Sequence, residues 1–143
     1  MEEKTMLGIA YILSLVPVVN LVGFILLIVG WIKLGNKYKE NLWKWVGYSA
    51  ILAIIAAIIT FITLFESLST GGIEAIYSSL VTAIPVLVIS IIYGIIQALG
   101  LWKAGTKFNS WLLKAGGIVL IVPVLNIIGN LLAGVGFLTV KEK

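Results

Sequence analysis

Inside the apolar runs of this chain, two prolines and two asparagines recur at the same spacing and could do chemistry there. Pro17 and Asn20 lie in the segment Val-Pro-Val-Val-Asn-Leu-Val-Gly, and Pro123 and Asn126 lie in Val-Pro-Val-Leu-Asn-Ile-Ile-Gly, 106 positions later. Over the sixteen residues that start at 16 and at 122, eight are identical. Aliphatic segments match one another by chance, but the shared Pro, Asn and two Gly indicate an internal repeat.

The repeat predicts either a polar site or a seam of close helix packing. A proline inside a helix frees the carbonyl four residues earlier, and an amide one turn away can bond that carbonyl. Paired breaks of this kind could hold a small polar solute or ion near the bilayer midplane. Small residues at helical spacing favour the packing seam, because they let two backbones approach. We expect the first and last apolar segments to pack antiparallel through these residues: Pro17, Asn20, Gly23, Gly30, Pro123, Asn126, Gly129 and Gly136.

The titratable residues exclude most catalytic and metal-binding chemistry. All ten basic residues are Lys, all six acidic residues are Glu, and the chain has no His and no Cys. Without imidazole or thiolate, no nucleophile–base set or zinc site can be assembled, and Glu66 with Glu74 would make a weak metal site. The apolar segments carry no ionisable residue near their centres, which disfavours proton-coupled carriers. We expect no enzymatic activity, no catalytic residues, no cofactor and no bound metal.

The composition places most of this chain in lipid. It is 61% hydrophobic and 11% charged, with a mean hydropathy of +1.16, too few charges to cover a soluble domain of 143 residues. A bilayer core of about 30 Å takes about 20 helical residues. The sequence predicts a single all-α membrane domain over 1–143 with four spans, at about 7–32, 45–65, 80–101 and 115–140. A re-entrant hairpin turning at Pro17 is disfavoured, because its first leg is too short to cross.

The connections between these predicted spans differ in charge. The loops at 33–44 and 103–114 are rich in Lys, whereas the loop near 66–77 holds two Glu and no Lys. Short Lys-rich loops stay on the cytoplasmic side of a membrane. We therefore expect a multi-pass protein of the cell membrane with the two Lys-rich loops inside and both termini outside.

All five tryptophans flank the two Lys-rich loops. Indole rings favour the boundary between headgroups and hydrocarbon, where the ring is half-buried and its N–H stays hydrated. We expect five interface anchors on the cytoplasmic side: Trp31, Trp43, Trp45, Trp102 and Trp111.

Three segments of the chain carry a resemblance: Gly-Trp-Ile-Lys-Leu-Gly-Asn-Lys-Tyr-Lys-Glu at 30–40, Leu-Trp-Lys-Trp at 42–45, and the segment 108–114 that enters the last span. With them, the chain resembles a family of small four-span membrane proteins found mainly in archaea and known only as a domain of unknown function. The resemblance covers most of the chain and implies a four-span fold with a broken first span. It implies no activity and no site residues, because the family has none assigned.

The absence of reactive groups and the small-residue seams favour a non-catalytic membrane protein that acts through helix packing, as an assembly or membrane-organising subunit. A small channel or minimal carrier, with its site at the paired Pro/Asn breaks, is the alternative. The expected partners are membrane lipids, with a homo-oligomer or another membrane protein left open. Nucleic acid is not expected, since no domain presents the lysines to it.

Overall fold

The computed structural model describes residues 1–140, and every regular element in that part of the chain is helical, which confirms the expected all-α class for these residues. Residues 141–143 lie outside the described part. The elements are α1 (Glu3–Leu13), α2 (Asn20–Lys37), α3 (Asn41–Thr70), α4 (Gly72–Lys107), α5 (Trp111–Leu120), the short 3-10 helix η1 (Pro123–Leu125) and α6 (Asn126–Thr139).

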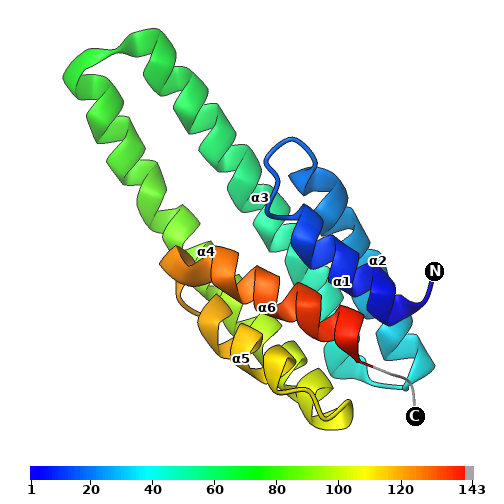
Figure 1. Cartoon of the computed structure of the whole chain (residues 1–143). Helices are drawn as coiled ribbons and strands as arrows, with labels where there is room; N and C mark the ends of the chain where they lie inside the picture. Colours follow the sequence, from blue (N-terminus) through cyan, green and yellow to red (C-terminus); the bar gives the residue numbers. More distant parts are fainter. Residues whose placement is uncertain (141–143) are drawn as a thin grey trace.

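The segment expected to form the first span, 7–32, folds as two helices that pack against each other, so the prediction that it crosses the membrane as one span kinked at Pro17 is wrong. The chain reverses between α1 and α2, so that α2 packs back along α1 as a hairpin (Figure 1). Pro17 stands in this reversal. A proline contributes no N–H, and the neighbouring N–H groups of Leu15 and Val16 bond carbonyls three residues earlier. The tip therefore leaves few backbone donors to satisfy, which suits a turn placed in lipid.

The segment expected to form the last span, 115–140, is broken in the same way, and that prediction is also wrong. α5 ends at Leu120, η1 begins at Pro123, and α6 packs back along α5. Val122 is extended, with φ −93° and ψ 108°, as steric contact with the following proline ring requires. Both copies of the repeated motif thus form the tip of a helical hairpin, and the tight hairpin that we disfavoured is the structure that forms.

The two middle spans that the sequence predicts, 45–65 and 80–101, lie within the two longest helices. α3 has 30 residues and α4 has 36, which corresponds to lengths of about 45 Å and 54 Å. Gly71 and Gly72 join them with φ values of 61° and 74°, a conformation that side chains disfavour. By length and composition, three helices of the described chain could cross a membrane: α2, α3 up to Ser69, and α4.

Each helix packs against the next one along the chain, and α6 closes the ring by packing against α1. The last contact depends on two glycines. A Cβ on Gly8 would lie 3.0 Å from the carbonyl oxygen of Gly134, and a Cβ on Gly134 would lie 3.1 Å from the carbonyl oxygen of Gly8. Figure 1 shows that the two short hairpins cover only the part of α3 and α4 near the chain termini.

The molecule consequently has two regions with different surroundings. We call the six-helix part the base, and we call residues 57–89, where α3 and α4 continue alone, the distal arm. In the base, residues far apart in sequence are fully buried, among them Tyr11, Trp31 and Phe137. In the distal arm, Ala75 is the one described side chain classed as buried.

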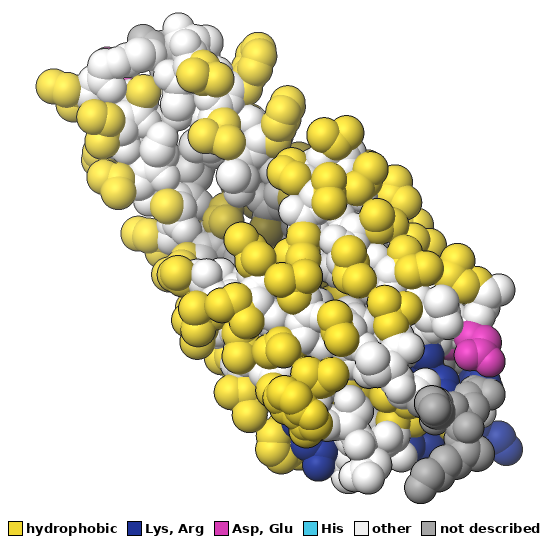
Figure 2. All heavy atoms as spheres, in the orientation of Figure 1, with side chains coloured by type: hydrophobic (Ala, Val, Ile, Leu, Met, Phe, Trp, Pro, Cys, Tyr) yellow, Lys and Arg dark blue, Asp and Glu magenta, His cyan; other side chains and the backbone are white. Residues whose placement is uncertain are grey.

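The lysines of the described chain belong to the base, whereas Glu66 and Glu74 lie in the distal arm. On the face shown in Figure 2, apolar side chains are spread along the whole length of the molecule and the lysines lie toward one end. Glu3 Oε2 lies 3.2 Å from Lys37 Nζ, so the start of α1 is at the same end as the first Lys-rich turn. The prediction that the termini and the Lys-rich loops lie on opposite faces is therefore wrong for the N-terminus. The cause is the reversal at Pro17, which returns the chain to its starting side.

Candidate functional site

The two asparagines of the predicted midplane site lie at the tips of separate hairpins. Asn20 begins α2 and Asn126 begins α6. The Oδ1 atom of Asn126 accepts a hydrogen bond of 2.8 Å from Asn130, one turn along the same helix. The Oδ1 atom of Asn20 is buried and has no hydrogen-bond partner in the part of the chain that the structure describes. The structure thus gives the two amides different surroundings.

The glycines of the predicted seam pack within each hairpin and not between the first and last segments. A Cβ on Gly23 would meet the backbone of Ser14 at 2.6 Å, and one on Gly30 would meet Leu7 at 2.8 Å, both across the first hairpin. In the second hairpin, Gly129 faces Leu120 and Gly136 faces Leu113. These glycines do allow close helix packing, but the prediction that they join the first segment to the last is wrong. The turn of each hairpin places them against the other helix of the same hairpin.

A polar network fills the centre of the base. The Tyr11 hydroxyl donates to Oε1 of Gln97 and accepts a hydrogen bond of 3.1 Å from Nε1 of Trp31. Nε2 of Gln97 donates to the Val46 carbonyl at 3.1 Å and to the Ser49 hydroxyl at 3.3 Å. These bonds join α1, α2, α3 and α4, and Gln97 has no exposed surface. Because the partners are satisfied and closely packed, the network fixes the arrangement of the helices.

Tryptophan burial divides the five expected interface anchors into two groups. Trp31 and Trp43 have no exposed surface and lie in the core, so the prediction that they anchor an interface is wrong. Nε1 of Trp43 donates to the Gly100 carbonyl at 3.3 Å, which satisfies its polar group inside the protein. Trp45, Trp102 and Trp111 are 68%, 50% and 71% exposed, and these three keep the surface position that an anchor needs.

The two Lys-rich turns have the same backbone structure. After α2, the N–H of Glu40 bonds the Gly35 carbonyl at 2.8 Å, and after α4 the N–H of Ser110 bonds the Gly105 carbonyl at the same distance. The residue before each donor is left-handed: Lys39 has φ 55° and Asn109 has φ 51°. Both turns end a helix by the same capping geometry, with an aromatic residue, Tyr38 or Phe108, just before the left-handed position.

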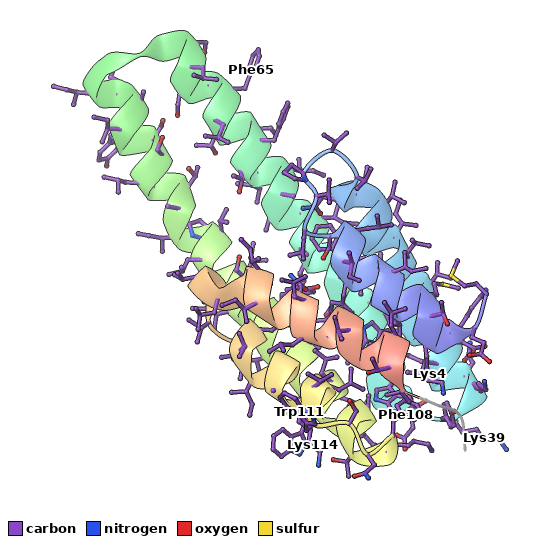
Figure 3. All side chains as sticks on the ribbon, in the orientation of Figure 1. Lys4, Lys39, Phe65, Phe108, Trp111 and Lys114 are labelled. Atoms are coloured by element: carbon purple, nitrogen blue, oxygen red, sulfur yellow. The ribbon has the colours of Figure 1, made fainter. Side chains whose placement is uncertain are left out.

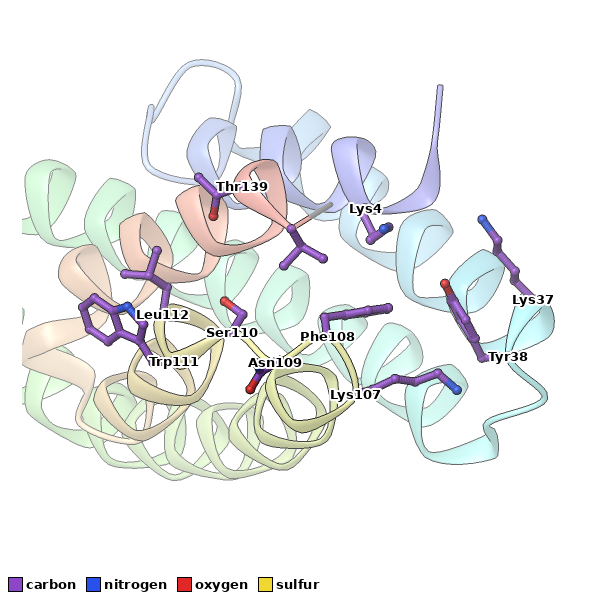
Figure 4. A pocket seen from close by; sticks show the side chains of 11 residues that line it. Lys4, Lys37, Tyr38, Lys107, Phe108, Asn109, Ser110, Trp111, Leu112 and Thr139 are labelled. Carbon is purple, nitrogen blue, oxygen red and sulfur yellow. The ribbon is translucent and has the colours of Figure 1, made fainter. Parts of the chain in front are cut away.

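A cleft lies between these two turns and the ends of α1 and α6, at the end of the base (Figure 4). Its volume is about 800 Å³. We call it the basic cleft; its lining residues are Lys4, Lys37, Tyr38, Lys107, Phe108, Asn109, Ser110, Trp111, Leu112, Thr139 and Val140.

The lysines of the basic cleft are held against aromatic rings. Lys4 is only 2% exposed, and its Nζ lies 5.1 Å from the centre of the Phe108 ring. Lys107 Nζ lies 4.3 Å from the centre of the Tyr38 ring. Ring faces attract ammonium groups, so these contacts orient the two side chains. Lys37 Nζ forms the ion pair with Glu3. An arrangement of this kind can bind an anion.

The basic cleft was not predicted, although the sequence carries a signal for it. The pattern Lys-x-Gly-x-Lys followed by an aromatic residue occurs at 33–38 and again 70 positions later at 103–108. We interpreted both segments as separate loops that set orientation. The two segments lie side by side only because the helices close into a ring, and a local sequence pattern does not predict that closure.

A second hollow lies beside Pro123, between the distal arm and the tip of the second hairpin. It has a volume of about 390 Å³. Five hydroxyl side chains line it: Thr60, Thr63, Ser79, Thr82 and Ser90. Each of these hydroxyls donates to a backbone carbonyl one turn earlier in its own helix. Because the hydroxyl protons are already used by the backbone, the hollow has little donor capacity for a solute.

Among residues 1–140, no group of three or more His, Cys, Asp or Glu side chains comes together as a metal site. Comparisons of the chain with protein-family models, with curated proteins and with solved structures found no match. The resemblance to the archaeal four-span family therefore stays a prediction.

Proposed function

We propose that this protein is a non-catalytic membrane protein that organises the bilayer by acting as a wedge. The observation that carries the proposal is the difference in helix number between the two regions. Six helices pack together in the base, whereas α3 and α4 alone form the distal arm. The exposed surface of both regions is apolar, so both are suited to lipid.

The proposed orientation places the base in the cytoplasmic leaflet. The Lys-rich turns stay on the cytoplasmic side by the charge rule for short loops. The exposed Trp45, Trp102 and Trp111 belong to the same end and suit the headgroup boundary. The two short hairpins would then enter the bilayer and return, while α3 and α4 cross it. Helices of 10 to 18 residues are about 15 to 27 Å long, shorter than or close to the thickness of the hydrocarbon core.

This shape adds area to one leaflet only. A helix with its side chains is about 10 Å wide, so four extra helices occupy roughly 300 Å² more in the leaflet of the base. A bilayer accommodates unequal leaflet areas by bending, and inserted helices are sensitive to curvature for this reason. The bilayer around the protein is expected to curve with the cytoplasmic leaflet on the convex side.

The orientation is tested with single cysteines, because the natural chain contains none. We expect Glu2→Cys, Lys39→Cys and Asn109→Cys to react with an impermeant thiol reagent from the same side of the membrane. Glu74→Cys, at the far end of the molecule, is expected to react from the opposite side. Labelling of positions 2 and 39 from opposite sides would contradict the two re-entrant hairpins.

The wedge is tested by reconstitution into phosphatidylcholine vesicles of small and large diameter. In small vesicles we expect the base to lie in the outer, convex leaflet, so that nearly all Lys39→Cys is labelled from outside. In large vesicles the labelled fraction should approach one half, since the curvature there favours neither orientation. The Glu74→Cys variant is the matched control and should give the complementary fraction. The same labelled fraction at both diameters would contradict the wedge.

The alternative of a channel or carrier receives less support from the geometry. The centre of the base is filled by the hydrogen-bonded side chains of Tyr11, Trp31 and Gln97. A measured solute flux that is lost in the double change Asn20→Leu and Asn126→Leu would favour the alternative over the wedge.

A further inference from the structure

We propose that the basic cleft binds the phosphate group of an anionic glycerophospholipid from the leaflet around the base. The inference rests on the proposed function, because it requires the base to be immersed in a bilayer with its charged end at the level of the headgroups.

Three ammonium groups line the cleft from three different helices, and one of them, that of Lys37, is also paired with Glu3. Lys4 comes from the first turns of α1, Lys37 from the end of α2 and Lys107 from the end of α4. Figure 4 shows them around the Tyr38 and Phe108 rings. A phosphate diester presents several acceptor oxygens, and several lysines can contact it at once from different directions. Convergence from three elements distinguishes this cleft from a row of lysines along one loop.

The burial of Lys4 marks the cleft as more than a charged surface. Lys4 is only 2% exposed, so packing fixes the position of its side chain. Its ammonium lies over the Phe108 ring, which holds it beside the cleft. Because screening by solvent is weaker at a buried position, its charge attracts an anion in the cleft more strongly than an exposed lysine would.

The remaining walls favour a lipid over a small soluble anion. Leu112 and Val140 contribute apolar surface, and Trp111 lines the cleft while 71% of its surface is exposed. An exposed indole at the cleft is suited to the glycerol region of a bilayer. Ser110, Asn109 and Thr139 add polar groups near the lysines, and the volume of about 800 Å³ is in the range of small-ligand pockets.

Binding is measured by native mass spectrometry of the full chain in an uncharged detergent. The probes are phosphatidylglycerol, phosphatidylcholine and inorganic phosphate, each at the same concentration. We expect one tightly bound phosphatidylglycerol per chain, with weaker binding of phosphatidylcholine and of inorganic phosphate. Inorganic phosphate that binds as tightly as phosphatidylglycerol would overturn the lipid assignment and indicate a soluble phosphate-bearing ligand.

The variants compare a lysine of the cleft with a lysine outside it. Lys107→Gln is expected to weaken phosphatidylglycerol binding about fivefold, the effect of about 1 kcal/mol for one basic residue near an anionic lipid. Lys33→Gln removes the same charge from an exposed position that does not line the cleft, and should change binding less than twofold. Lys4→Gln should have an effect at least as large as Lys107→Gln, provided that its circular dichroism shows an intact helical fold.

An equal loss in Lys107→Gln and Lys33→Gln would overturn the site, because binding would then follow net charge alone. The vesicle test of the wedge uses phosphatidylcholine only, so its outcome does not depend on this cleft. If the protein does not bind phosphatidylglycerol but still takes the expected orientation in small vesicles, the lipid site is contradicted and the proposed function is not.

Discussion

The base and the distal arm are built from similarly apolar residues but differ in what surrounds them. Phe137, in the base, is 1% exposed and stacks against Tyr11 with ring centres 6.0 Å apart. Phe65, in the distal arm, is 68% exposed and projects away from its helix (Figure 3). The comparison teaches that apolar residues serve two purposes in one chain: they pack against protein in the base, and they form an exposed surface suited to lipid in the arm.

The polar groups of the two regions differ in the same way. In the base, Gln97 and Tyr11 bond across helices. In the distal arm, Thr60 and Thr63 bond the carbonyls of their own helix. Bonds between helices specify an arrangement, whereas bonds within one helix leave its neighbours undetermined. The bonds at the centre of the base join four helices and specify their arrangement, whereas the bond between Ser67 and Ser79 in the arm joins α3 to α4 alone.

The largest difference in stability is expected when a phenylalanine is replaced by alanine in each of the two regions. Phe137→Ala should lower the free energy of unfolding by about 3 kcal/mol, because it leaves a cavity among packed side chains. Phe65→Ala should lower it by less than about 0.5 kcal/mol, since lipid replaces the lost ring. Unfolding by titration with a denaturing detergent, followed by circular dichroism, measures both. Equal losses would show that the arm is covered by protein and would contradict the comparison.

Removal of a polar side chain from each region should give a smaller difference in the free energy of unfolding. Gln97→Leu removes bonds to two other helices and leaves the buried hydroxyl of Tyr11 without its acceptor, so we expect a loss of about 1 to 2 kcal/mol. Ser67→Ala removes one bond of 2.9 Å to Ser79 in the arm and should cost about 0.6 kcal/mol. The same detergent titration applies. A greater cost for Ser67→Ala would mean that the arm, and not the base, holds the specific polar contacts.

The hairpin tips, where the base meets the arm, allow a finer comparison. Asn126→Leu removes the bond with Asn130 and is expected to cost about 0.6 kcal/mol. Asn20→Leu removes an acceptor that has no partner among the described residues, so it should be neutral or slightly stabilising. Thermal unfolding of the two variants distinguishes these outcomes. A marked destabilisation by Asn20→Leu would show that this amide has a role that the structure does not contain.

The smallest effect is expected at the charged end of the base. Lys103 pairs with Glu40, and both side chains are partly exposed, at 45% and 29%. Exposed ion pairs contribute little, so Lys103→Gln should cost no more than about 0.5 kcal/mol. The loss should disappear at high salt, because ions screen the exposed charges. A cost that persists at high salt would indicate that Lys103 contributes to packing.

Much of the local structure could be predicted from the chain. The apolar runs predicted helices, and the helices break close to Pro17 and Pro123, as the repeated motif indicated. The candidate site could not be predicted in the same way. The seam was assigned to the wrong helices, two tryptophans were placed at an interface although they are buried, and the basic cleft was missed. Each error concerns which distant segments meet, which residue spacing does not encode.

The sequence by itself determined that the chain is helical and that lipid is its expected solvent, and its repeated motif indicated breaks beside Pro17 and Pro123, whereas Pro85 lies inside the continuous helix α4. A proline lacks a backbone donor whether the chain continues or turns back, so composition could not decide between a kinked span and a hairpin. The tertiary structure decided it through close backbone contacts across the chain, such as Gly8 against Gly134. Those contacts exist only once the ring of six helices has closed, and the same closure brings Lys4, Lys37 and Lys107 together.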